Sequence, residues 1–165
     1  MTRVRLSIAV AVVLIAATSA HAFYRIGTRP TGALLVSTLE IGQPVPKLAI
    51  QPLIPQLPIV SGCRIIVVFS PACPHCHSAK QAEARSTQLH RLPTTWLAAE
   101  NDSATIAFGR GMHADSRLGF AASAKKKLRI QAVPAAFLVD PEDVVRNIWV
   151  YQGTEDHDDL RKNCT

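Results

Sequence analysis

An apolar run that ends directly in two closely spaced cysteines constrains this chain more than any other feature. Residues 64–69 (Arg-Ile-Ile-Val-Val-Phe) have the β-branched composition of a buried strand, and Ser-Pro-Ala-Cys-Pro-His-Cys follows at once. This order predicts that Cys73 and Cys76 lie where a strand gives way to a helix. Pro74 suits the first helical position, because the N–H that it lacks would have no partner there.

A cysteine at a helix N-terminus is well placed for thiol chemistry. Unpaired backbone N–H groups and the positive end of the helix dipole favour the thiolate, which is the form that attacks a disulfide. His75 adds a hydrogen-bond donor or a partial positive charge near Cys73. The pattern predicts a redox-active dithiol, in which Cys73 attacks a partner's sulfur and Cys76 resolves the mixed disulfide.

Residues 1–22 have the features of an export signal. Two arginines precede an apolar run over residues 6–17, and Ala20-His21-Ala22 fits a cleavage site before Phe23. The run is too short to cross a bilayer unless it extends to Tyr24, so a cleaved signal peptide and an uncleaved N-terminal membrane anchor both stay open. Either would deliver the domain to the periplasm or another extracytoplasmic, oxidising compartment.

The remainder of the chain suits one globular domain. Its 165 residues are 48% apolar and 18% charged, and we expect a linker over residues 23–41 and a single domain over residues 42–165. The net charge of +6 becomes +4 if residues 1–22 leave with their two arginines. That charge is too small and too scattered to indicate nucleic-acid binding. The lysines at 125–127 are interpreted as the solvated face of a helix.

Apolar runs and turn residues predict an α/β order with a central mixed sheet flanked by helices. The expected strands are 47–53, 64–69, 94–98, 131–140 and 144–151, with edge or loop structure around Pro52, Pro55 and Pro58. The expected helices are 76–90, 116–128 and 155–162, the last capped by Thr154, with a further helix N-cap within residues 100–103. This order predicts one helical crossover and an antiparallel edge.

Two expectations concern individual side chains. Trp96, Phe137 and Trp149 are predicted to lie in the core. Lys80 and Glu83, three residues apart in the first long helix, are predicted to form an exposed pair on its surface.

The order of motifs resembles the thioredoxin family over roughly residues 42–163. It comprises a strand, Cys-Pro-His-Cys at a helix start, Val133-Pro134 opening a later strand, a hairpin and a final helix. The resemblance implies a thioredoxin fold, a cis bond before Pro134, and backbone groups of Val133 that are free to bind substrate. The export segment, the turn-rich residues 41–46 that lead into the domain, and the strand at 137–140 look most like the TlpA/ResA branch. In contrast, Cys-Pro-His-Cys together with Val-Pro is typical of DsbA-type oxidants. Val67 stands where thioredoxin has a buried aspartate.

The resemblance also implies a function. It indicates an extracytoplasmic thiol–disulfide oxidoreductase that exchanges disulfides with cysteine-containing protein substrates and with a membrane or soluble redox partner. Such a protein needs no cofactor besides its own Cys73–Cys76 disulfide, and contacts the membrane only through an uncleaved N-terminal segment. A stabilised thiolate favours an oxidant. The TlpA-like features favour a reductant in cytochrome c biogenesis, so the direction of electron flow stays open.

Two further cysteines, Cys63 and Cys164, stand outside the Cys-x-x-Cys motif. Four cysteines allow three pairings. Given a dithiol at 73 and 76, Cys63–Cys164 is the natural second pair, and some TlpA-like proteins hold a second disulfide. Two unpaired thiols are the alternative.

Two rival interpretations use the same residues. Cys73-Pro74-His75-Cys76-His77 also fits the attachment motif of a c-type haem, which would make the chain an electron-transfer protein with His77 as axial ligand and Met112 or His113 as the sixth ligand. A zinc or copper site would combine the two cysteines with His75 and His77. No second ligand pair of the usual spacing follows, so no metal is expected.

Overall fold

The computed structural model describes residues 36–53, 62–88 and 91–164 of the chain. The expected export segment, residues 23–35 of the expected linker, Pro55 and Pro58 lie outside the described residues. Among the residues that are described, no helix is long and apolar enough to cross a membrane.

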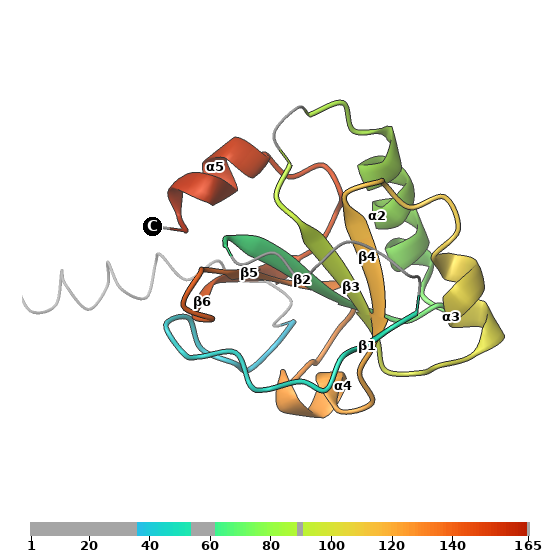
Figure 1. Ribbon diagram of the computed structural model, residues 1–165, viewed down its shortest axis with the longest axis horizontal. Helices are drawn as coiled ribbons and strands as arrows, with labels where there is room; N and C mark the ends of the chain where they lie inside the picture. The colour runs from blue at the N-terminus through green and yellow to red at the C-terminus, as the bar shows by residue number, and fades with distance from the viewer. Residues whose placement is uncertain (1–35, 54–61, 89–90, 165) are drawn as a thin grey trace, which may run out of the picture. The chain divides into compact units, whose positions relative to one another are not determined.

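A six-stranded mixed sheet forms the centre of the domain (Figure 1). Its strands are β1 (Gln51–Pro52), β2 (Arg64–Phe69), β3 (Thr94–Ala98), β4 (Ser116–Phe120), β5 (Ala135–Val139) and β6 (Val145–Val150). The helices are α2 (Pro74–Arg85), α3 (Ser103–Phe108), α4 (Ala124–Lys127) and α5 (His157–Lys162). The expected α/β class with a mixed sheet is therefore confirmed.

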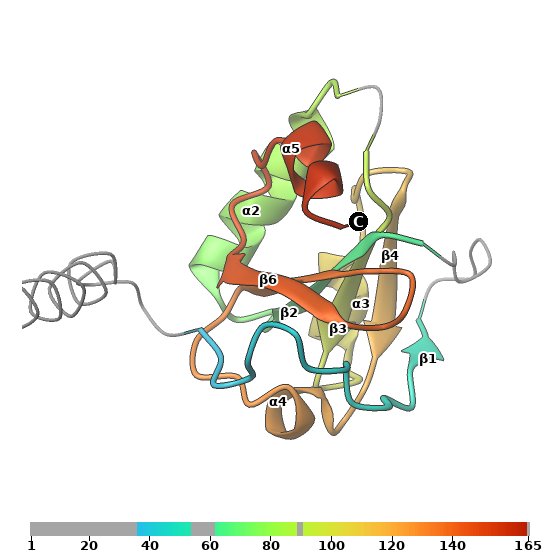
Figure 2. The same ribbon diagram turned by 90° about the vertical axis from the view of Figure 1, so that its left-hand side faces the viewer.

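The strand order is β1-β4-β3-β2-β5-β6. Strands β2, β3 and β4 are parallel, whereas β1, β5 and β6 pair antiparallel with their neighbours. The expectation of one helical crossover is wrong, because both α2 and α3 connect parallel strands. Helices α2, α3 and α5 contribute to the core on one face of the sheet, and α4 packs with residues 36–48 on the other (Figures 1 and 2).

The central strand β2 is apolar and buried from Ile65 to Phe69 because helices or loops cover both of its faces. Ile65, Val67 and Phe69 pack on the α2 side, and Ile66 and Val68 pack on the α4 side. This alternation follows from the two-residue period of a strand. The predicted bounds of β2 and β3 are both confirmed.

The helix expected over residues 116–128 is wrong in its first half, which is the strand β4. Ser116 and Leu118 face the core beneath α2, and β4 pairs with β3 over its whole length. Gly119 has no Cβ, and one built there would lie 2.8 Å from the Cγ2 atom of Ile50. Close packing against the neighbouring segment thus selects the strand, and the helix shrinks to α4.

The last helix also begins later than expected. Asp156, rather than Thr154, caps α5, and its carboxylate accepts hydrogen bonds from the backbone N–H groups of Asp158 (2.9 Å) and Asp159 (3.2 Å). The preceding turn is held instead by Glu155, which accepts from the indole N–H of Trp149 at 3.0 Å. Trp149 is only partly buried, whereas Trp96 and Phe137 are fully buried as expected.

Gly153 lets this turn lie directly on helix α2. A Cβ at this position would be 2.1 Å from the carbonyl oxygen of Ala79 and 2.7 Å from the backbone nitrogen of Glu83. Its φ of +78° is also unfavourable for other residues. The chain after β6 is therefore seated against the backbone of α2.

Part of the expected linker belongs to the packed domain. Val36 and Leu39 are buried, and Ser37 pairs with Ile130 in an antiparallel bridge. The carbonyl of Val36 accepts from the N–H groups of Gln131 (2.8 Å) and Ala132 (3.4 Å). Backbone pairing with the segment before β5 makes these residues part of the packed domain.

Helix α5 is attached to the sheet at both of its ends. His157 is buried, and its Nδ1 atom accepts from the backbone N–H of Leu92 at 2.9 Å. Burial, reinforced by the positive charges of Arg91 and Arg161, lowers the pKa of His157 to about 4, so the ring is neutral near pH 7. Just beyond the helix, Cys164 forms a disulfide with Cys63 at the start of β2.

Replacing both Cys63 and Cys164 by alanine is expected to lower the free energy of unfolding by about 3–5 kcal/mol, because the disulfide closes a loop with a sequence separation of 101 residues. Urea unfolding at neutral pH measures this loss. A matched control, Cys73→Ser, removes a thiol but keeps a good helix cap and is expected to stay within about 0.5 kcal/mol of the parent. Equal stability of the double variant and the parent would contradict the expectation.

Candidate functional site

Cys73 occupies the N-cap position of helix α2. Its Sγ atom accepts a hydrogen bond from the backbone N–H of Cys76 at 3.4 Å, and Pro74 begins the helix. The sulfur thus takes the place that an oxygen of serine or aspartate fills in most N-caps. At this point it lies at the positive end of the helix dipole.

The two thiols lie in very different surroundings. Cys73 is partly exposed, whereas Cys76 has no exposed surface and belongs to the core cluster beneath α2. Burial, together with a hydrogen bond to Cys73, raises the pKa of Cys76 to about 12. No disulfide joins the two cysteines in this structure. Cys73 is therefore the thiol that an outside sulfur can reach.

The segment before β5 lies against Cys73. The Val133–Pro134 peptide bond is cis, and the Cys73 thiol donates to the carbonyl of Val133 at a sulfur–oxygen distance of 3.6 Å. Val133 is partly exposed and Pro134 is buried. The structure therefore brings together four of the six residues expected at the site: Cys73, Cys76, Val133 and Pro134.

Pro74 and His75 both lie exposed in the first turn of α2. Within the described part of the chain, the His75 ring forms no hydrogen bond. Any effect of His75 on Cys73 therefore acts through its charge rather than through a direct contact.

His77, an exposed residue of α2, links three segments of the site. Its Nε2 atom lies at hydrogen-bond distance, 2.8 Å, from the carbonyl oxygen of Pro71, and its ring packs edge-on against Phe108 of α3, with centroids 5.0 Å apart. Lys80 adds a second link, because its ammonium group donates to the carbonyls of Phe108 (2.8 Å) and Arg110 (3.0 Å). The turn that leads into Cys73 is thus tied to α2 and α3.

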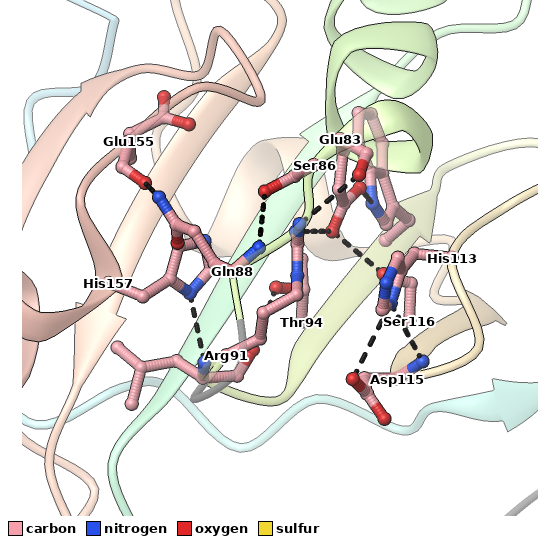
Figure 3. Close-up of polar contacts among 12 residues, drawn as sticks. Glu83, Ser86, Gln88, Arg91, Thr94, His113, Asp115, Ser116, Glu155 and His157 are labelled. Atoms are coloured by element: carbon pink, nitrogen blue, oxygen red, sulfur yellow. Dashed lines mark hydrogen bonds and ion pairs between the residues drawn. The ribbon is translucent and has the colours of Figure 1, made fainter.

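The expected exposed pair of Lys80 and Glu83 is wrong. Glu83 has no exposed surface, and its carboxylate accepts hydrogen bonds from Ser116 (2.7 Å), Trp96 (2.8 Å) and Arg91 (3.1 Å) (Figure 3). These donors come from β4, β3 and the segment before β3. A buried charge needs such compensation, so the network fixes the second half of α2 to the sheet. Sequence spacing alone does not distinguish a buried glutamate from an exposed one.

Arg91 also explains why α2 is shorter than expected. Its guanidinium group donates to the backbone carbonyl of Glu83 at 3.1 Å as well as to the Glu83 carboxylate. The helix ends at Arg85, and Ser86 has the extended φ and ψ of −65° and 132°. The expected extension to His90 is therefore wrong, because the chain turns back to place Arg91 beside the helix end.

The geometry does not suit a c-type haem. Covalent attachment needs both thiols at the surface, whereas Cys76 is fully buried among core residues. The Nε2 atom of His77 contacts Pro71, and the Nδ1 atom of His113 accepts from the N–H of Asp115 at 3.2 Å. In the described ranges, no three His, Cys, Asp or Glu side chains are grouped to hold a metal ion.

Comparison with known proteins identifies the architecture. No protein-family model and no curated protein sequence matches the chain. Among solved structures, a peroxiredoxin-like protein from Aquifex aeolicus matches with a TM-score of 0.54 and 18% identity over 76% of this chain and 86% of that chain. A thiol-disulfide isomerase from Corynebacterium glutamicum matches with a TM-score of 0.52 and 19% identity, covering 71% of this chain and 90% of that chain. The chain has a thioredoxin-like fold.

The thioredoxin-like fold raises the question of whether Glu83, the buried carboxylate of α2, replaces the buried aspartate of thioredoxin. Val67 is a buried apolar residue of β2, at the position where the family resemblance implies a buried aspartate in thioredoxin. Glu83 does not replace that group, because it lies seven residues after Cys76, about 10 Å along the helix, and is fully engaged by its donors. No described carboxylate forms a hydrogen bond with either thiol.

The unequal burial of the two thiols has a measurable consequence. In the protein with the 73–76 pair reduced and the Cys63–Cys164 bond intact, iodoacetamide is expected to modify Cys73 first. With a pKa of about 12, only about 10⁻⁴ of Cys76 is thiolate at pH 8, and this fraction rises about tenfold per pH unit up to pH 11. Peptide mass spectrometry after timed alkylation measures both rates. Equal modification of the two cysteines at pH 8 would refute this asymmetry.

A second prediction concerns the Glu83 network. Glu83→Ala leaves the buried Arg91 charge without its carboxylate partner and is expected to cost about 3–5 kcal/mol of unfolding free energy. Arg85→Ala, on the exposed side of the same helix, is the matched control and is expected to cost no more than about 0.5 kcal/mol. Urea unfolding of both variants measures these changes in unfolding free energy. A cost below about 1 kcal/mol for Glu83→Ala would contradict the role assigned to the network.

Proposed function

We propose that this chain is an extracytoplasmic thiol–disulfide oxidoreductase that acts on cysteine-containing proteins through Cys73 and Cys76. One observation carries the proposal: an accessible sulfur caps helix α2, with a buried second thiol behind it and a cis Val133–Pro134 bond beside it. A structural staple is a poor alternative role for this pair, because a two-residue spacer closes too short a loop to stabilise much.

The reaction begins with the Cys73 thiolate. It attacks one sulfur of a partner's disulfide, a Cys73–partner disulfide forms, and the partner's other sulfur leaves as a thiolate that takes up a proton. The Cys76 thiol then loses its proton to water or to the departing thiolate and attacks the Sγ atom of Cys73. The partner leaves with two thiols, and Cys73 and Cys76 become a disulfide. The reverse sequence transfers a disulfide to the partner.

Several residues support these steps. The N–H of Cys76 and the N-terminus of α2 stabilise negative charge on Cys73, and His75 adds to this stabilisation when it is protonated. Burial raises the pKa of Cys76 and so keeps its thiol protonated before the mixed disulfide forms. The backbone of Val133, next to Cys73, is where a partner segment would bind.

Two features support a location outside the cytoplasm. The N-terminal 22 residues have the pattern of an export signal or anchor. The Cys63–Cys164 disulfide is of the kind that persists in oxidising compartments. We assign the chain to the TlpA/ResA-like group of exported proteins, served by a membrane or soluble redox partner.

Three proteins test the proposal: the parent, Cys73→Ser and Cys76→Ser. The parent is expected to reduce or oxidise a disulfide-containing test protein, and Cys73→Ser is expected to lose this activity by at least about 10³-fold. Cys76→Ser is expected to accumulate a mixed disulfide at Cys73, visible on a non-reducing gel, because the resolving thiol is missing. Turnover by Cys73→Ser would exclude the mechanism.

The same protein, equilibrated in a glutathione redox series, reports the direction of electron flow. A midpoint near about −120 mV identifies an oxidant, and one near about −270 mV identifies a reductant. An absorption spectrum serves as the control, because an acid-stable Soret band would indicate covalent haem and exclude dithiol chemistry.

A further inference from the structure

The dithiol lies at one defined edge of the sheet. Strands β2, β3 and β4 are parallel and end in register at Phe69, Ala98 and Phe120. Helices α2, α3 and α4 begin a few residues beyond these ends. Strand β5 starts at the same edge, since Ala135 pairs with Val68. We call this edge, which carries Cys73, Val133 and the start of α4, the dithiol edge.

Helix α4 and the residues just after it present two cations at the dithiol edge. Lys126 and Arg129 are both exposed. The backbone that carries them is held firmly: the N–H of Arg129 bonds to the carbonyl of Lys126 (3.2 Å), and the carbonyl of Arg129 accepts from Thr38 (3.2 Å). Within the described residues, neither the Lys126 ammonium nor the Arg129 guanidinium group has a hydrogen-bond or ion-pair partner.

Nearby carboxylates do not neutralise these cations. Two acidic side chains follow β3 toward the same edge: Glu100 pairs with Lys125 at 3.3 Å, and Asp102 caps α3 by accepting from Thr105 at 2.7 Å. Glu83, the one acid in α2, is buried in its own network. Asp102 is itself exposed, so the two cations without an ion-pair partner at this edge, Lys126 and Arg129, outnumber its one exposed carboxylate without such a partner.

Exposed acids gather at the opposite edge of the sheet. Glu142 and Asp143 lie in the turn after β5, whose last residue, Val139, pairs with the first residue of β2. Asp158 and Asp159 lie in the first turn of α5, the helix joined to the start of β2 by the Cys63–Cys164 disulfide. Two of these acids are paired, Asp143 with Arg64 and Asp159 with Lys162, so the charge at this opposite edge is mixed.

We propose that the dithiol edge selects protein partners that carry acidic residues near the reacting cysteines, with Lys126 and Arg129 as the recognising groups. This inference rests on the proposed function, because it names the class of substrate for that site. A positive surface beside an accessible sulfur raises the rate of encounter with an anionic partner.

Three disulfide peptides test the proposal. They share one sequence around the disulfide, but one is flanked by three glutamates and the other by three lysines, and a third carries neutral serines. We expect kcat/KM for the acidic peptide to exceed that for the basic peptide by about tenfold or more in 20 mM salt. The ratio should shrink toward one in 500 mM salt, where charges on the surface are screened.

Matched variants assign the preference to the surface. Lys126→Glu/Arg129→Glu is expected to reduce or reverse the preference for the acidic peptide and to leave turnover of the neutral peptide unchanged. Arg85→Glu, in the last turn of α2, makes the same kind of charge change away from the dithiol edge and is expected to preserve the preference. Equal kcat/KM for acidic and basic peptides, or equal effects of both sets of substitutions, would overturn the proposal.

The outcomes separate this proposal from the one it rests on. If the neutral peptide is turned over but charge makes no difference, the oxidoreductase function stands and the selection of acidic partners falls. If none of the three peptides is turned over, the proposed function itself fails. Sedimentation with phosphatidylglycerol vesicles gives a further check: vesicle binding that Lys126→Glu/Arg129→Glu abolishes, without any preference among peptides, would assign the surface to a membrane and overturn the proposal.

Discussion

The compensation of one buried charge governs where the reactive helix lies. Glu83 cannot be buried in α2 unless donors surround it, and those donors come from β3, β4 and the segment that ends with Arg91. Satisfying them sets the position and the length of α2. At the other end of the same helix, the Cys73 cap and the His77–Pro71 contact fix the first turn. The two thiols therefore occupy a helix that is held at both ends.

This arrangement makes chemically identical side chains behave differently. Cys73 and Cys76 are three residues apart, yet one faces solvent beside Val133 and the other is enclosed by the core. The difference comes from the helical period, which turns the second cysteine toward the sheet. Thiol–disulfide exchange requires two thiols in different surroundings, because one attacks the partner's disulfide and the other resolves the mixed disulfide.

The sequence predicted the parts of the fold in which local pattern and burial agree. Strand β2 is apolar from Ile65 to Phe69 and β3 has a strand-like Thr-Thr-Trp-Leu-Ala composition, and the bounds of both were predicted correctly. Strand β4 was missed because Ser-Arg-Leu-Gly-Phe has no strong preference until it pairs with β3, and the alanines and lysines after it suggested a helix. Glu83 was misassigned for a related reason, since its partners are brought together only by the tertiary fold. The proximity of Val133 to Cys73 came from the family resemblance and not from any local pattern.

Strand β2 joins two sulfur pairs of opposite character. Cys63 precedes the strand and is bonded to Cys164, which is almost completely buried, while Cys73 follows the strand and is accessible. The six residues of β2 separate the two pairs by roughly 20 Å. No direct exchange between them is feasible across that span, so the folded domain can cycle its 73–76 pair while the other bond keeps a constant oxidation state. A single strand thus leads into the candidate dithiol at one end and follows the covalent anchor of the C-terminal helix at the other.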